Sequence, residues 1–230
     1  MRPRTGLAFV LALAALPAIG GELTPFDVPF TSQGFEQINA DRGVTVFKDH
    51  ESPNVRLAAE GVVPASPEVV RDALLAYELQ PELFGNVAEA RILVRGEDRL
   101  LPYQRLDLPV VDDRDNTLWI TWGRDGDTLW IRHRLAPSLG PAARDDAVRV
   151  PFHAGSWQIR PLGGGRRALV RLQVTIDLGG WIPRWLARAA AGDEVPGVFA
   201  DICRVAARLG RPCAAPTLVQ EGAARMKKAL

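Results

Sequence analysis

The sequence predicts an α+β domain in which a curved antiparallel sheet wraps round a long C-terminal helix. Between residues 44 and 178, short segments of alternating apolar and polar side chains are separated by turn signals such as Asp125-Gly126-Asp127. From residue 183 to residue 209 the apolar side chains instead recur at helical spacing. Because short turns join successive strands, an antiparallel meander is the simplest topology, and the last helix is the longest element available to cover it.

Local signals define the elements in chain order. We expect a short helix at 33–39, then strands at 44–48 and 55–63 that pair as a hairpin. Ser66, Pro67 and Glu68 supply a capping hydroxyl, a proline at the first helical position and an acidic first turn, so a helix should begin there and end near Pro81. Further strands are expected at 88–95, 100–106, 117–124, 128–135, 148–159 and 169–178, and a kink or break in the last helix at 196–197.

Bulk composition excludes several classes of protein. The chain has 230 residues, which suits one domain, and 28 Lys and Arg against 27 Asp and Glu, so no overall charge attracts nucleic acid. The three histidines, His50, His133 and His153, are scattered and lack a carboxylate or cysteine at ligand spacing. No phosphate-binding loop precedes a helix and no serine has an evident base. We therefore expect no metal and no cofactor.

The first twenty residues have the pattern of a signal peptide. Arg2 and Arg4 precede an apolar run at 7–16, and the small residues Ala18 and Gly20 follow it. We expect cleavage near Gly20 and a periplasmic or secreted protein, with an uncleaved anchor or a misassigned start as alternatives. The remaining divisions are an extended arm at 21–34, the folded domain at 35–210 and a tail at 211–230. In an oxidising compartment Cys203 and Cys213 could form a disulfide, and two free thiols are equally compatible with the sequence.

Strand alternation assigns side chains to two faces. In the last strand Val170, Leu172, Val174 and Ile176 share an apolar inner face, and Arg171, Gln173, Thr175 and Asp177 face water. His133 is the one titratable group that the alternation places on an otherwise apolar inner face. It could bond a ligand hydroxyl or carbonyl, or be a core histidine satisfied by its neighbours. A sheet of this size round one helix leaves a cavity for an apolar guest, or closes into a packed core.

Two motifs resemble the START (StAR-related lipid transfer) family. The segment 108–116, LPVVDDRDN, is similar to the family's proline-rich approach to an Arg-Asp pair at a strand start, and 176–186, IDLGGWIPRWL, is similar to its last strand, glycine turn and helix opening. The likeness runs in order from about Phe35 to Leu209. It implies a helix-grip (START-like) fold with a lipid-sized tunnel, carriage of sterols, phospholipids or related molecules, and usually no catalysis.

The resemblance also implies roles for particular residues. Arg114 and Asp115 would form an ion pair, with backbone hydrogen bonds, that pins the strand end. The turn residues that would let the last helix swing as a gate are Gly179, Gly180 and Pro183. Trp181 and Trp185 would be gate or membrane-contact residues, or ordinary core residues. The buried arginine of some sterol-binding relatives has no equivalent in 118–122, which leaves His133, Tyr103 and Thr121 as candidate polar contacts.

We therefore expect a monomeric, non-catalytic carrier of a lipid or sterol-like small molecule that contacts membranes transiently. The residues expected to contact the ligand are Tyr103, Leu118, Ile120, Trp122, Leu129, Ile131, His133, Phe152, Trp157, Val174, Ile176, Ile182, Trp185 and Phe199. The alternative is a helix-grip enzyme, cyclase-like or hydrolase-like, that acts on an apolar substrate in the same tunnel, with His133 and Asp107 as the first catalytic candidates. A third possibility is a structural or sensory module with a closed core.

Overall fold

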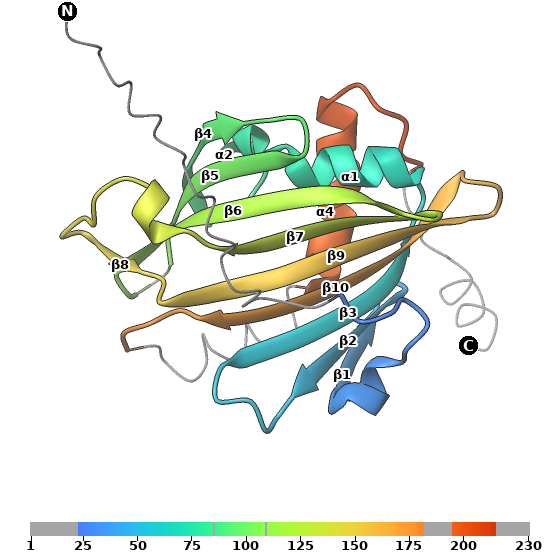
Figure 1. Ribbon diagram of the computed structural model, residues 1–230, viewed down its shortest axis with the longest axis horizontal. Helices are drawn as coiled ribbons and strands as arrows, with labels where there is room; N and C mark the ends of the chain where they lie inside the picture. The colour runs from blue at the N-terminus through green and yellow to red at the C-terminus, as the bar shows by residue number, and fades with distance from the viewer. Residues whose placement is uncertain (1–22, 85, 109, 182–194, 215–230) are drawn as a thin grey trace, which may run out of the picture.

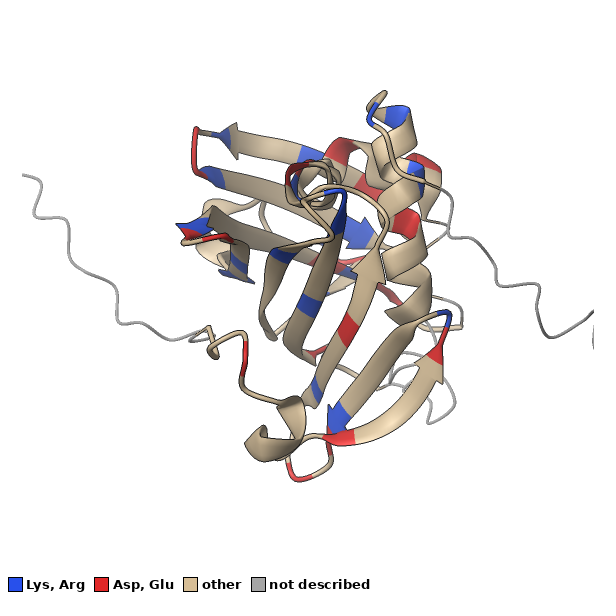
Figure 2. Cartoon of the chain, turned by 90° about the vertical axis from the view of Figure 1, so that its right-hand side faces the viewer, with Lys and Arg blue, Asp and Glu red and all other residues tan. Residues whose placement is uncertain are grey.

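The computed structural model describes residues 23–84, 86–108, 110–181 and 195–214 (Figure 1). The predicted signal peptide, most of the predicted tail and the start of the predicted C-terminal helix lie outside these residues. So do Ile182, Pro183 and Trp185. No helix in the described part of the chain is both long and apolar enough to cross a bilayer. Basic and acidic residues are interspersed over the described elements (Figure 2), in keeping with the net charge of +1.

Ten strands form one curved sheet (Figure 1). They are β1 (Glu36–Asp41), β2 (Val44–Asp49), β3 (Val55–Val63), β4 (Val87–Arg95), β5 (Arg99–Leu106), β6 (Asp113–Asp125), β7 (Thr128–Leu135), β8 (Ala147–Arg149), β9 (Phe152–Leu162) and β10 (Arg167–Asp177). The order in the sheet is β1-β2-β3-β10-β9-β7-β6-β5-β4, with every neighbouring pair antiparallel, and β8 pairs in parallel with β6. The predicted fold class is confirmed, and the simple meander is broken where β3 pairs with β10.

Two helices cover the concave face of the sheet. Helix α1 (Pro67–Leu75) begins as predicted, because the Ser66 hydroxyl accepts a hydrogen bond from the Val69 amide at 3.4 Å. Helix α4 (Val195–Arg208) contains Pro196 in its first described turn and crosses behind the strands in Figure 1. The two helices contact each other and share one apolar core with the sheet. The other helical segments are short: η1 (Phe30–Gln33), η2 (Tyr77–Leu79), α2 (Gln80–Leu83) and η3 (Pro137–Leu139).

Two predicted elements are wrong, and so is the predicted end of a third: α1 ends at Leu75, and Pro81 lies instead in the first turn of the separate helix α2. The helix expected at 33–39 is instead the short η1 followed by β1, because the Arg42-Gly43 turn, with both φ angles positive, returns the chain so that Asp41 pairs with Val44. The single strand expected at 148–159 is two strands, β8 and β9. Pro151 lies between them and has no amide hydrogen to donate, so the chain leaves β6 there and begins a new strand along β7 and β10.

The segment before η1 crosses the convex face of the sheet and covers Arg171. The Arg171 side chain is only 3% exposed, although strand alternation predicted that it faces water. Its guanidinium donates to the carbonyl oxygens of Phe26 and Val28 and stacks on the Phe30 ring at 3.9 Å from the ring centre. The prediction of the outward direction was right, and the burial results from the arm, which strand periodicity does not describe.

The end of α4 is tied back to the start of α1. At Gly210, where φ is +67°, the chain reverses, and the Arg211 amide donates to the Ala206 carbonyl at 2.8 Å. Cys203 and Cys213 form a disulfide, with their Cα atoms 5.3 Å apart. Beyond it the Ala214 amide donates to the carbonyl of Pro64 at 3.0 Å. Of the two alternatives that the sequence left open for the cysteines, the structure has the disulfide.

Candidate functional site

Five central strands present a continuous apolar concave face. Because opposite residues of paired strands share a face, the registers align Ile120, His133, Gly155, Val174 and Leu57 in one row across β6, β7, β9, β10 and β3. The neighbouring rows carry most of the other predicted contact residues. The predicted residues that this face brings together are Leu118, Ile120, Trp122, Leu129, Ile131, His133, Trp157, Val174 and Ile176. From α4, Phe199 packs against Trp157, with ring centres 6.0 Å apart.

Three residues predicted to contact the ligand lie on the convex face instead. Tyr103 pairs with Thr117 rather than with the inward-facing positions of β6, and Thr121 pairs with Arg132. Phe152 precedes the inward-facing His153, is 37% exposed, and borders a convex groove of about 270 Å³. Tyr103 and Thr121 were predicted to contact the ligand without regard to strand register. The observed registers place Tyr103, Thr121 and Phe152 on the convex side of the sheet.

Two histidines lie among the apolar residues in the centre of the concave face. The imidazoles of His133 and His153 meet edge to face, with ring centres 4.9 Å apart and planes at 75°. The Nε2 atom of His133 and the Nδ1 atom of His153 are buried and have no hydrogen-bond partner among the described residues. Sequence reasoning treated His153 as isolated. The signal that could have found it is its inward parity with Gly155 and Trp157 on a strand that pairs with β7.

Gly155 makes room for His133. It lies directly opposite His133 in the β7–β9 register, and a Cβ atom at this position would be 2.7 Å from both Cε1 and Nε2 of the His133 ring. The same Cβ would be 2.5 Å from the Gln173 carbonyl oxygen. Any larger residue here would therefore displace the imidazole or separate the strands.

Burial keeps both imidazoles neutral. It lowers the pKa of His153 to about 4, and burial together with the nearby His153 ring lowers the pKa of His133 well below 6.5. Each ring therefore offers one N–H donor and one nitrogen acceptor at neutral pH. No group of three His, Cys, Asp or Glu residues in the described part of the chain could hold a metal ion.

Arg114 and Asp115 do not pair with each other, contrary to the role that the START resemblance implied. They are adjacent in β6, so their side chains point to opposite faces of the sheet. The Arg114 guanidinium is 1% exposed and donates to the carbonyls of Asp112, Leu178 and Gly179. Arg114 thus joins the loop that precedes β6 to the glycine turn that follows β10.

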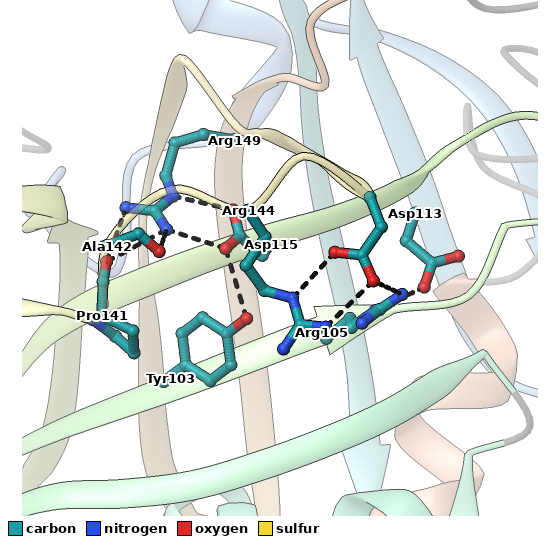
Figure 3. A network of polar contacts seen from close by, with 9 residues as sticks. Tyr103, Arg105, Asp113, Asp115, Pro141, Ala142, Arg144 and Arg149 are labelled. Atoms are coloured by element: carbon teal, nitrogen blue, oxygen red, sulfur yellow. Dashed lines mark hydrogen bonds and ion pairs between the residues drawn. The ribbon is translucent and has the colours of Figure 1, made fainter.

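Asp115 belongs to a polar network on the convex side (Figure 3). Its carboxylate accepts two hydrogen bonds from Arg149, at 2.7 and 2.8 Å, and one from the Tyr103 hydroxyl at 3.2 Å. Burial, reinforced by the Asp115 charge, raises the pKa of Tyr103. Arg149 also donates to the carbonyls of Pro141 and Ala142, so the network fastens the 136–146 loop over the outer side of β5 and β6. This network is structural and lies apart from the concave face.

A second hollow opens beside the concave face. It measures about 640 Å³, and residues of α1, the β4–β5 hairpin and the end of α4 line it together with Trp122. Its rim is charged, and most of the charges are paired: Arg71 and Arg211 contact Asp72, and Arg95 contacts Glu78. Trp122 therefore connects the apolar concave face to a polar mouth at this end of the sheet.

Three solved structures have the same fold. A STAR-related lipid transfer protein from Xanthomonas axonopodis matches with a TM-score of 0.65 at 23% identity, over 77% of this chain and 99% of that chain. Human STARD10 matches with a TM-score of 0.66 at 17% identity, over 78% of this chain and 77% of that chain. Human StAR-related lipid transfer protein 5 matches with a TM-score of 0.66 at 18% identity, over 77% and 88%. The architecture is that of a START-type helix-grip domain, as the motifs predicted.

Residues 63–203 match the sequence family described as polyketide cyclase / dehydrase and lipid transport. The chain belongs to this family. An uncharacterised protein of Pseudomonas aeruginosa is 26% identical over 191 residues, which are 80% of this chain and 88% of that protein. Fold and family together support the binding of a hydrophobic ligand.

Proposed function

We propose that this protein carries a lipid, or a similarly apolar molecule, between the concave face of its sheet and its C-terminal helix, and releases it unchanged. One observation carries the proposal. The inward positions of 55–63, 118–122, 129–135, 153–159 and 170–176, all of them described, hold only apolar side chains, glycine and two neutral histidines. Burying an apolar chain against such a surface is favourable by roughly 0.8 kcal/mol per methylene group.

We further propose that the carrier contacts membranes through the two loops that Arg114 joins. Each loop exposes a large apolar side chain: Val110 is 75% exposed and Trp181 is 74% exposed. Indole side chains are favoured at the boundary between lipid and water. These two loops lie at the end of the sheet where β6 begins and β10 ends, so a membrane bound there would face one end of the concave face.

Export from the cytoplasm is also part of the proposal. It is supported by the signal-peptide pattern at 1–20 and by the disulfide between Cys203 and Cys213, because such bonds persist in oxidising compartments. Comparison of the N-terminus of mature protein from the native host with the gene-encoded one tests this point. A mature chain that still begins at Met1 would contradict it.

The histidine pair favours a second candidate, an enzyme of the same family that acts on an apolar substrate. Two neutral imidazoles in contact on an apolar surface could exchange protons with a bound substrate. Asp107, the other predicted catalytic candidate, is exposed in the loop after β5. It has no contact with His133 among the described interactions, so the pair of histidines is the better-supported catalytic group.

Native mass spectrometry of freshly purified protein tests both candidates. A carrier should retain stoichiometric lipid, and delipidated protein mixed with a lipid extract should recover it with unchanged mass. Recovered ligand of altered mass would favour the enzyme, and protein that takes up no lipid would contradict the carrier. Val174→Trp should abolish uptake by filling the concave face, and Thr175→Trp is the matched control because the adjacent side chain points to the convex side.

A further inference from the structure

We propose that His133 and His153 together select a ligand whose polar group is an uncharged hydroxyl or carbonyl, in preference to a carboxylate or an ammonium group. This inference rests on the proposed carrier function and names the chemical class that the same surface accepts. The ligand would be a long-chain or polycyclic molecule with one neutral polar end, such as a fatty alcohol or a hydroxylated ring system.

The first support is the set of buried polar atoms without a partner. Five side-chain atoms in the described residues are of this kind, and three of them, on Asn116, His133 and His153, lie on the inward-facing side of their strands. Buried polar groups in folded proteins are nearly always hydrogen-bonded. Two of these three atoms belong to rings that contact each other, so one polar group of a bound ligand could serve as the partner of both.

The second support is the match between two neutral imidazoles and a hydroxyl. One ring can donate its N–H to the hydroxyl oxygen while the other accepts the hydroxyl proton. A carbonyl would use the N–H alone. Burial supports this state, because it lowers the pKa of both rings and keeps them uncharged at neutral pH. The 4.9 Å separation of the ring centres allows one small group to reach both rings.

The third support is the position of the charged side chains. Arg132 and Arg134 flank His133 in sequence and point to the convex face. Among the described strands, the nearest charged residues in the row of His133 are Arg95 on β4 and Lys48 on β2, three and four strands away. Arg114 also lies on the inward-facing side of β6, but its guanidinium already donates to the carbonyls of Asp112, Leu178 and Gly179. A carboxylate placed at the histidine pair would therefore lose its water without gaining a free cation, which is strongly unfavourable.

The test uses the full-length protein and three ligands with the same sixteen-carbon chain: hexadecanol, hexadecanoate and hexadecylamine. Binding at pH 7 is measured by displacement of a fluorescent apolar probe. We expect hexadecanol to bind at least about tenfold more tightly than either charged ligand. Equal affinities, or tighter binding of hexadecanoate, would overturn the selection rule while leaving the carrier function intact. Failure of all three, and of lipid extract, would instead refute the carrier.

Variants then assign the selection to the two rings. Hexadecane, which lacks a polar group, is measured beside hexadecanol in the wild-type protein and in each variant. His133→Phe combined with His153→Phe keeps aromatic volume and removes the hydrogen-bonding nitrogens, so the advantage of hexadecanol over hexadecane seen in the wild-type protein should fall to about twofold or less. His153→Gln retains a donor and an acceptor and should preserve part of that advantage, which keeps the test valid if the double variant does not fold. His50→Phe, at an exposed position in the β2–β3 turn, should leave every affinity unchanged. An undiminished preference for hexadecanol in a folded double variant would contradict the assignment.

Discussion

This protein should begin to lose stability as the pH falls below about 6.5, which is above the pH range where most carboxylates titrate. The reason is that two histidines are buried in the neutral form. Burial lowers the pKa of His153 to about 4 from its ordinary value of 6.5. Below pH 6.5 the unfolded chain therefore binds a proton that the folded chain refuses until about pH 4. The contribution of the neutral His153 to the free energy of unfolding is therefore fully present above pH 6.5 and is lost as the pH falls toward 4.

The magnitude follows from the size of that shift. Each unit is worth about 1.4 kcal/mol, so His153 alone should lower the free energy of unfolding by about 2 to 3 kcal/mol between pH 7 and pH 4.5. The pKa of His133 moves in the same direction and adds to this loss. For a domain of this size such a change is a large part of the total stability.

Urea denaturation of delipidated protein, followed by tryptophan fluorescence at several pH values from 7 to 4.5, measures the effect. The double variant His133→Phe with His153→Phe should lose less than about 1 kcal/mol over the same range. His50→Gln, altered at an exposed histidine, should follow the wild-type protein. A double variant with the full wild-type pH dependence would refute the reasoning, because the acid sensitivity would then come from other groups.

Three further perturbations test the packing. Gly155→Ala should lower the free energy of unfolding, measured in urea, by about 1 to 3 kcal/mol, because the new Cβ atom would meet the His133 ring and the Gln173 carbonyl. Gly197→Ala is the control, because a Cβ atom there meets nothing within 4 Å, and equal stability of the two variants would contradict the argument. Arg114→Gln should speed amide hydrogen exchange and proteolysis at 178–181 by releasing two carbonyls of the glycine turn, and unchanged exchange there would show that Arg114 does not hold it. Cys203→Ser should lower stability by about 2 to 3 kcal/mol, as should reduction of the wild-type disulfide, and a melting temperature insensitive to both would count against the bond.

The alternating strands and the cap of α1 could be predicted because both depend on neighbouring residues. Ser66 and Pro67 specify the start of α1 locally, and inward parity correctly grouped the apolar residues of β6, β7 and β10. The edge strand β1 could not be predicted in the same way. Its burial pattern is almost wholly exposed, so it lacks the alternation that marks a half-buried strand, and pairing with β2 defines it.

The candidate site was predicted in part because it depends on register between distant segments. His133 was identified from the parity of its own strand. Its partner His153 requires the pairing of β7 with β9, across the long 136–146 loop and β8. In the same way, Arg114 finds its carbonyl partners 64 and 65 residues later in the chain, at Leu178 and Gly179. Composition and spacing within one segment carry no information about such partners.

The pairing of β3 with β10 has a consequence for how the chain reaches its native state. Val55 pairs with Ile176, and Val63 pairs with Ala168, so the two halves of the sheet join only after more than a hundred residues have been made. Until β10 arrives, β3 and β9 each present an unpaired edge to which another chain could add. A contact of such long range slows folding, so aggregation should compete most strongly during synthesis and refolding, before the last strand is in place.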